Sequence, residues 1–131
     1  MIFVDTSFWI ALFDSKDEHH ADAADLLSRF GESSLVCSNH VRGEGWTFLR
    51  RRHGHRAAVT YLDRLGRTSR LRIIGVAEEV EAQALRWLRR HDEREYSFVD
   101  ATSFSLMRSL KIRNALAFDG DFTAAGFVEL R

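Results

Sequence analysis

The sequence contains no proline and a single cysteine, Cys37. Without prolines, repeats or a glycine-rich stretch, no segment is typical of a linker, so we expect one domain over residues 1–131. A single cysteine excludes an intrachain disulfide, and its apolar neighbours indicate a buried core thiol. No apolar run approaches the roughly 20 residues of a membrane span, and none resembles a signal peptide. We therefore expect a cytoplasmic protein with no membrane segment.

Lysine is also scarce, because 17 of the 19 basic residues are arginine. The 19 acidic residues balance them to a net charge of zero, but the distribution is uneven. Residues 1–32 hold seven acidic residues and two basic ones, whereas residues 50–72 hold eight arginines and only Asp63. Since the planar guanidinium matches phosphate and stacks on bases, the second segment favours a polyanionic partner. A genome rich in arginine codons is the alternative explanation.

Short apolar runs alternate with stretches of helical periodicity along the chain. We predict strands at residues 2–4, 35–37, 71–76, 115–118 and 127–130, and helices at 7–13, 19–30, 38–49, 54–65, 77–91, 98–110 and 121–126. Short buried strands separated by helices indicate an α/β fold with a parallel sheet and helices on both faces. Because the crossovers are right-handed, the carboxyl ends of the strands share one edge, where open sheets have their functional crevice.

Four acidic residues are expected near that edge. Asp5 follows the first predicted strand directly, and Asp119 follows the fourth. Glu44 lies within the helix after the second strand, and Asp100 lies in the first turn of an otherwise apolar helix. Asp121 is an alternative to Asp119. We favour Asp119 because it directly follows its predicted strand. The joint placement of these residues predicts an acidic crevice.

Each acid taken singly also has a structural explanation. Asp5 and Asp121 could cap helices, and Asp119 with the following glycine could form a turn. Ser97 and Asp100 have the spacing of a capping box. Only the convergence of several acids at one sheet edge favours a chemical role.

Several carboxylates in one crevice would repel one another and raise their pKa values, and a hard divalent cation resolves that conflict. The six histidines form no His-x-x-x-His pair, and with one cysteine the chain has no zinc-binding spacing. An oxygen-only metal site beside an arginine-rich segment suits phosphodiester hydrolysis, in which the metal polarises a phosphoryl oxygen and activates water.

These motifs resemble those of PIN-domain nucleases. The chain opens on Val4-Asp5-Thr6-Ser7, and the later acidic motifs of the family are matched by Glu44, Phe98-Val99-Asp100-Ala101 and Phe118-Asp119-Gly120-Asp121-Phe122. Together they resemble most the VapC toxins of bacterial toxin–antitoxin systems. The resemblance implies a three-layer fold with about five parallel strands, Mg²⁺- or Mn²⁺-dependent endoribonuclease activity, a cognate antitoxin and a homodimer. Residues 91–100 resemble members that cut the sarcin–ricin loop of large-subunit ribosomal RNA; other relatives cut transfer RNA.

We assign hypothetical roles to these residues from the expected position of the acids at one sheet edge. Asp5, Asp100 and Asp119 would bind the metal, and Glu44 would orient or deprotonate the attacking water. Thr6 or Ser7 would hold a ligand carboxylate in place. Phosphate contacts are expected from four arginines: Arg50, Arg51, Arg52 and Arg56. The glycines at 43 and 45 are expected to loosen the helix that carries Glu44.

Two other functions were compared with this one. A PIN-fold module that binds RNA or a protein partner without catalysis is the main alternative, although all four acids are present. A phospho-acceptor receiver domain would need an acidic pair after the first strand and a late lysine, whereas Asp5 stands alone and no lysine follows Lys111. The sequence therefore favours the nuclease.

Overall fold

A single parallel sheet organises the chain, and the computed structural model describes all 131 residues. The sheet has five strands in the order β3-β2-β1-β4-β5, and every neighbouring pair is parallel. The strands are β1 (Ile2–Val4), β2 (Leu35–Ser38), β3 (Leu71–Ile74), β4 (Asn114–Leu116) and β5 (Val128–Glu129). The predicted α/β fold with a parallel sheet is confirmed.

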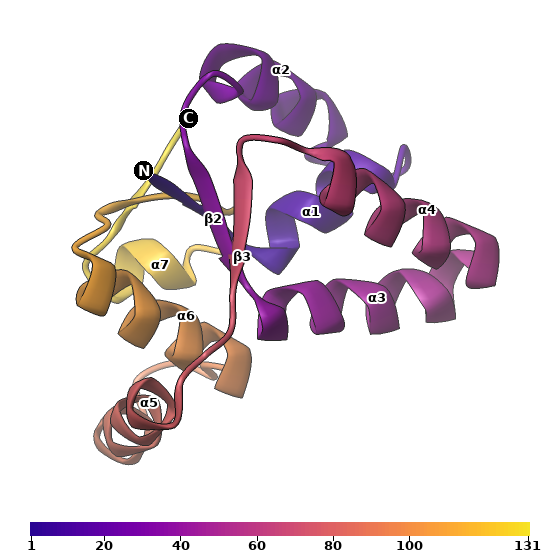
Figure 1. Cartoon of the computed structure of the whole chain (residues 1–131). Helices are drawn as coiled ribbons and strands as arrows, with labels where there is room; N and C mark the ends of the chain where they lie inside the picture. Colours follow the sequence, from indigo (N-terminus) through magenta and orange to yellow (C-terminus); the bar gives the residue numbers. More distant parts are fainter.

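Seven helices connect the strands. They are α1 (Thr6–Phe13), α2 (His20–Phe30), α3 (Asn39–His53), α4 (His55–Arg67), α5 (Glu78–Arg90), α6 (Phe98–Leu110) and α7 (Asp121–Ala124). Figure 1 shows α1, α3 and α4 on one side of the sheet and α6 and α7 on the other, with α5 packed outside α6. None of these helices combines the length and apolar character that crossing a bilayer requires.

The core explains why β1 and α6 carry the candidate site. β1 is the central strand, and its three residues are buried because they are apolar on both faces. In α6 every residue from 100 to 107 is buried, although several of them are polar. Side chains at the carboxyl end of β1 and the start of α6 therefore lie at the margin of the core, with little water around them.

Two strands end two residues earlier than the sequence pattern predicts. β4 ends at Leu116, because the next residues bond elsewhere; the N–H of Phe118 donates to Ser7 Oγ at 3.0 Å. β3 ends at Ile74, and the N–H of Val76 donates to the side chain of Asn39 at 2.9 Å. The prediction that Asp119 directly ends a strand is therefore wrong. Asp119 lies on the turn between β4 and α7.

The glycines around Glu44 do not interrupt α3, which is continuous from Asn39 to His53. A Cβ atom at Gly45 would overlap the side chain of Tyr61, whereas a Cβ atom at Gly43 would meet open space. The Tyr61 hydroxyl donates to the carbonyl of Arg42 at 3.1 Å. Gly45 therefore permits the close approach of α3 and α4 that holds α3 in place.

Candidate active site

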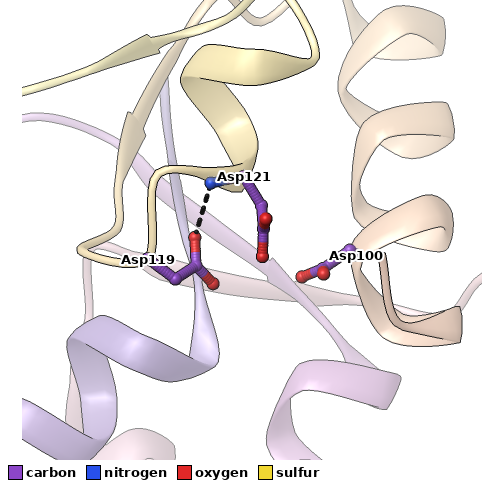
Figure 2. Close-up of side chains that lie close together, drawn as sticks. All are labelled: Asp100, Asp119 and Asp121. Carbon is purple, nitrogen blue, oxygen red and sulfur yellow. Dashed lines mark hydrogen bonds between the residues drawn. The ribbon is translucent and has the colours of Figure 1, made fainter. Parts of the chain in front are cut away.

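Three aspartates bring their carboxylates together at the carboxyl edge of the sheet (Figure 2). Asp100 lies in the first turn of α6, and it faces Asp119, on the turn between β4 and α7, and Asp121, the first residue of α7. One oxygen from each carboxylate lies within 4.8 Å of the other two. The N–H of Asp121 donates to Asp119 Oδ1 at 3.0 Å, which links the turn to the start of α7. The structure thus brings both Asp119 and Asp121 to Asp100.

Asp5 directly follows β1 and lines the same cleft, a hollow of about 400 Å³. Its Oδ2 accepts hydrogen bonds from the N–H of Ser7 at 3.1 Å and from the Ser7 hydroxyl at 2.7 Å. Ser7 Oγ in turn accepts from the N–H of Phe118 at 3.0 Å. The hydrogen bonds by which Asp5 caps α1 therefore also orient its carboxylate, and Ser7 connects it to the segment that carries Asp119.

Glu44 lies at the boundary of this cleft. It belongs to the second turn of α3, is half-buried and lines the cleft together with the aspartates. It also lines a neighbouring hollow of about 420 Å³, in which Arg51 and Arg52 lie. Glu44 is therefore the point where the acidic cleft meets an arginine-bearing surface of α3.

The structure does not gather into one patch the four arginines that we expected to contact phosphate: Arg50, Arg51, Arg52 and Arg56. Arg51 and Arg52 share the hollow beside Glu44, but Arg52 lies 3.7 Å from the buried carboxylate of Asp14. Arg56 lines a separate hollow, and Arg50 is exposed near the end of α3. Arg51 is thus the best placed of the four beside the cleft.

Two charged residues that the sequence analysis missed hold the segment from Asp119 to the start of α7. Arg94 donates from Nε to Asp121 Oδ1 at 2.9 Å, and its Nη2 lies 2.8 Å from the same oxygen. On the other side, the carboxylate of Glu129 accepts from the N–H of Gly120 at 3.3 Å and of Thr123 at 2.8 Å. No local pattern indicates either contact, because Arg94 lies 27 residues before its partner and Glu129 is part of the last strand.

Burial and mutual repulsion raise the pKa values of the clustered acids. Burial foremost, then repulsion from Asp119 and Asp100, raises the pKa of Asp5 well above its ordinary value. Burial, with repulsion from Asp119 and Asp121, raises the pKa of Asp100 to about 7. The cleft walls also desolvate the Asp119 carboxylate and raise its pKa, although much of that residue is exposed. Negative charge in this cleft is therefore costly without a cation.

The ligand atoms of the cleft fit a hard divalent cation. They are carboxylate and hydroxyl oxygens, and neither cysteine nor histidine lines the cleft. The hydroxyl of Thr6 is buried there without a hydrogen-bond partner, which leaves it available to a water molecule or another oxygen ligand. An all-oxygen set of this kind favours Mg²⁺ or Mn²⁺ over Zn²⁺.

Two relatives and one solved structure that resemble this chain over its whole length are described as an endonuclease or an RNA-cleaving toxin. The PIN domain family profile matches residues 2–128. The chain is 55% identical over 131 residues to the 23S rRNA-specific endonuclease VapC20 from two strains of Mycobacterium tuberculosis, covering 100% of this chain and 98% of each relative. The crystal structure of M. tuberculosis VapC20, a Sarcin-Ricin loop cleaving toxin, has a TM-score of 0.93 and 53% identity, covering 100% of this chain and 99% of that one. This chain therefore belongs to the PIN domain family and, within it, to the VapC proteins.

Proposed function

We propose that this chain is a divalent-metal-dependent endoribonuclease and the toxin of a type II toxin–antitoxin system. The observation that carries the proposal is the convergence of Asp100, Asp119 and Asp121 with Asp5 in one oxygen-only cleft. The high identity to an endonuclease over the whole chain supports it. Clustered acids that raise one another's pKa values are costly to ionise unless a cation is bound. Such a cluster is therefore expected at a cation-binding site.

Asp5, Asp100 and Asp119 would hold the cation, and Asp121 is close enough to take part. A bound Mg²⁺ or Mn²⁺ would supply polarisation of a phosphoryl oxygen and a lowered pKa of water. Ser7 holds Asp5 by the two hydrogen bonds described above, and the free hydroxyl of Thr6 offers a further oxygen.

Glu44 orients the attacking water and takes its proton in this proposal. Its half-buried place in the cleft, with Arg51 and Arg52 in the next hollow, supports this role. An RNA backbone that passes over Arg51 would reach the cleft beside Glu44. Of the four candidate arginines, Arg51 is therefore the one we assign to phosphate binding with most support.

The substrate we propose is structured RNA, with the sarcin–ricin loop of 23S rRNA first and transfer RNA second. The first choice is supported by the relatives, which are a 23S rRNA-specific endonuclease and a Sarcin-Ricin loop cleaving toxin. We further propose a cognate antitoxin that blocks the cleft, a homodimeric assembly and a cytoplasmic site of action.

Cleavage by the purified protein tests this proposal. Intact ribosomes and total transfer RNA are incubated with Mg²⁺, with Mn²⁺ or with a chelator, and the new RNA ends are mapped by sequencing. We expect one metal-dependent cut in the sarcin–ricin loop, and none with Asp5→Asn. Cuts confined to transfer RNA would identify transfer RNA as the substrate. RNA binding without any cut would favour the non-catalytic alternative.

A further inference from the structure

A second hollow adjoins the acidic cleft, and of the proposed cation ligands only Asp119 lines it. Its volume is about 290 Å³, and it shares Ser7, Ile10 and Asp119 with the cleft. Four further residues complete its lining, and we call them the base subsite: Asp17, Glu18, His19 and Phe118. RNA bound with a phosphate over the aspartates would therefore place a neighbouring nucleotide at this hollow.

The base subsite has a wall of stacked aromatic rings. The rings of His19 and Phe118 are nearly parallel, with an interplanar angle of 2° and centroids 4.5 Å apart. Behind them the fully buried Phe8 stacks on Phe118 at 5.9 Å, and the guanidinium of Arg131 lies 5.4 Å from the same ring. His19 remains about one-third exposed. Unstacked RNA bases pack on aromatic side chains of this kind, which are partly exposed and are held in place by a buried ring.

The carboxylates of Asp17 and Glu18 in the base subsite accept hydrogen bonds but cannot donate them. Asp17 Oδ1 accepts from the N–H of His19 at 2.8 Å, which fixes that carboxylate beside the ring. Glu18 Oε1 lies 3.5 Å from Nε2 of His19. Carboxylates repel phosphate and require a ligand edge that donates. Among the bases, guanine presents adjacent N1–H and N2–H donors, whereas uracil flanks its one donor with carbonyl oxygens.

We propose that the base subsite binds an unstacked guanine next to the cleaved phosphate and so selects the cut position. This inference rests on the proposed cleavage of RNA. Two hydrogen bonds connect the base subsite to the metal-binding cleft, from Phe118 N–H to Ser7 Oγ at 3.0 Å and from Ser7 Oγ to Asp5 Oδ2 at 2.7 Å. These bonds fix Phe118, and with it the His19 ring on which a base would stack, relative to Asp5.

The test compares guanine with inosine, which lacks the N2 amine. RNA oligonucleotides carrying the sarcin–ricin loop have each guanosine replaced by inosine in turn, and their kcat/KM values and their dissociation constants in a chelator are measured. For the wild type, inosine at one position of the loop should lower kcat/KM about tenfold and raise the dissociation constant about tenfold. In Asp17→Asn/Glu18→Gln that difference should shrink to about twofold. Asp25→Asn, which loses only the exposed pair with Arg29, should behave as the wild type.

The outcomes separate the two proposals. Equal affinity for guanine and inosine at every position of the loop, or a preference that survives in the double variant, overturns the base subsite even if cleavage is efficient. Absence of cleavage with a retained, variant-sensitive guanine preference in the chelator overturns the nuclease proposal and leaves the subsite standing. His19→Ala should also weaken binding, and His19→Phe should restore it, because the phenylalanine ring keeps the stack.

Discussion

At the scale of the residue, the carboxylate of Asp100 takes part both in a helix cap and in the acidic cluster. Its Oδ2 accepts from the N–H of Ser97 at 3.0 Å, while Ser97 Oγ accepts from the N–H of Asp100 at 2.9 Å. This is a complete capping box, and it holds the side chain in a fixed orientation toward Asp119 and Asp121. The structural explanation of Asp100 and the proposed chemical one are therefore both compatible with this geometry.

Replacing Asp100 by asparagine separates these two roles. The amide side chain can still cap α6 but removes a negative charge from the cluster, so RNA cleavage should fall by at least about a hundredfold. Because the charge of Asp100 is disfavoured by burial and repulsion, the metal-free variant at pH 8 should be more stable than the wild type by about 1 kcal/mol or more. Cleavage assays and urea unfolding measure both effects.

Asp92→Asn, in the exposed loop, is the control for Asp100→Asn. Undiminished cleavage by Asp100→Asn would show that Asp100 is not part of the site.

Arg94 is expected to position Asp121 and not to react itself. Its guanidinium is bound through Nε and Nη2 to one carboxylate oxygen, and lysine cannot reproduce both contacts. Arg94→Ala should weaken Mn²⁺ binding, measured by calorimetry, about tenfold, and Arg94→Lys should restore only part of it. Because the Arg94 side chain is solvent-exposed, the free energy of unfolding should hardly change. A large loss of stability with unchanged Mn²⁺ affinity would contradict this role.

At the scale of the element, the position of α3 depends on its contact with α4. The two helices are close at Gly45, where the ring of Tyr61 occupies the space of a side chain. Leu49 is fully buried one turn later, and Glu44 is adjacent to the contact. Placement of Glu44 at the cleft is therefore a consequence of helix–helix packing.

A matched pair of alanine substitutions tests this dependence. Gly45→Ala should destabilise the protein by about 1–3 kcal/mol, because the new methyl group overlaps Tyr61 in a packed core. Gly43→Ala meets open space within the same helix, so it should stabilise by about 0.5–1 kcal/mol through the higher helix propensity of alanine. Thermal unfolding compares the two. Equal effects of the two substitutions would show that the contact with Tyr61 is unimportant.

At the scale of the whole molecule, arginine placement should be visible in the salt dependence of RNA binding. Arg51 lies in the hollow beside Glu44, whereas Arg67 lies at the end of α4 and pairs with Asp63 at 3.9 Å. Arg51→Gln should lower the slope of log affinity against log salt by about one, and Arg67→Gln should leave it unchanged. Identical slopes for all three proteins, measured by fluorescence anisotropy, would place the RNA elsewhere.

The acid cluster should also make stability depend on pH and on metal. The pKa of Asp100 rises from 3.8 to about 7 on folding, so between these values the native state holds more protons than the unfolded chain. Its contribution to stability is therefore complete below about pH 4 and is lost as the pH rises through about 7. The raised pKa values of Asp5 and Asp119 act in the same direction.

Asp14 opposes this trend. Burial tends to raise the pKa of its carboxyl, but the N–H of Lys16 together with His53 and Arg52 lowers it below the ordinary value, so its contribution is lost in acid. The difference in melting temperature between wild type and Asp100→Asn isolates the cluster. In a chelator the wild type should fall further below the variant from pH 5 to pH 8, and Mg²⁺ or Mn²⁺ should stabilise it more at pH 8. A difference that does not vary with pH would contradict the raised pKa of Asp100.

The amino-acid sequence by itself determined the order of strands and helices, the parallel sheet and the helix caps at Ser38 and Ser97. These follow from local patterns, since apolar runs and helical periods act within one element. It also indicated which strands and helices would carry acids at the carboxyl edge.

Only the tertiary structure decided which side chains meet there. It placed Asp119 on a turn beyond the end of β4 and brought Asp121 to Asp100 as well. The contact of Arg94 with Asp121 and the stack of His19 on Phe118 join residues that lie far apart in the chain. Such contacts depend on the packing of whole elements against one another, and no local pattern in the sequence encodes them.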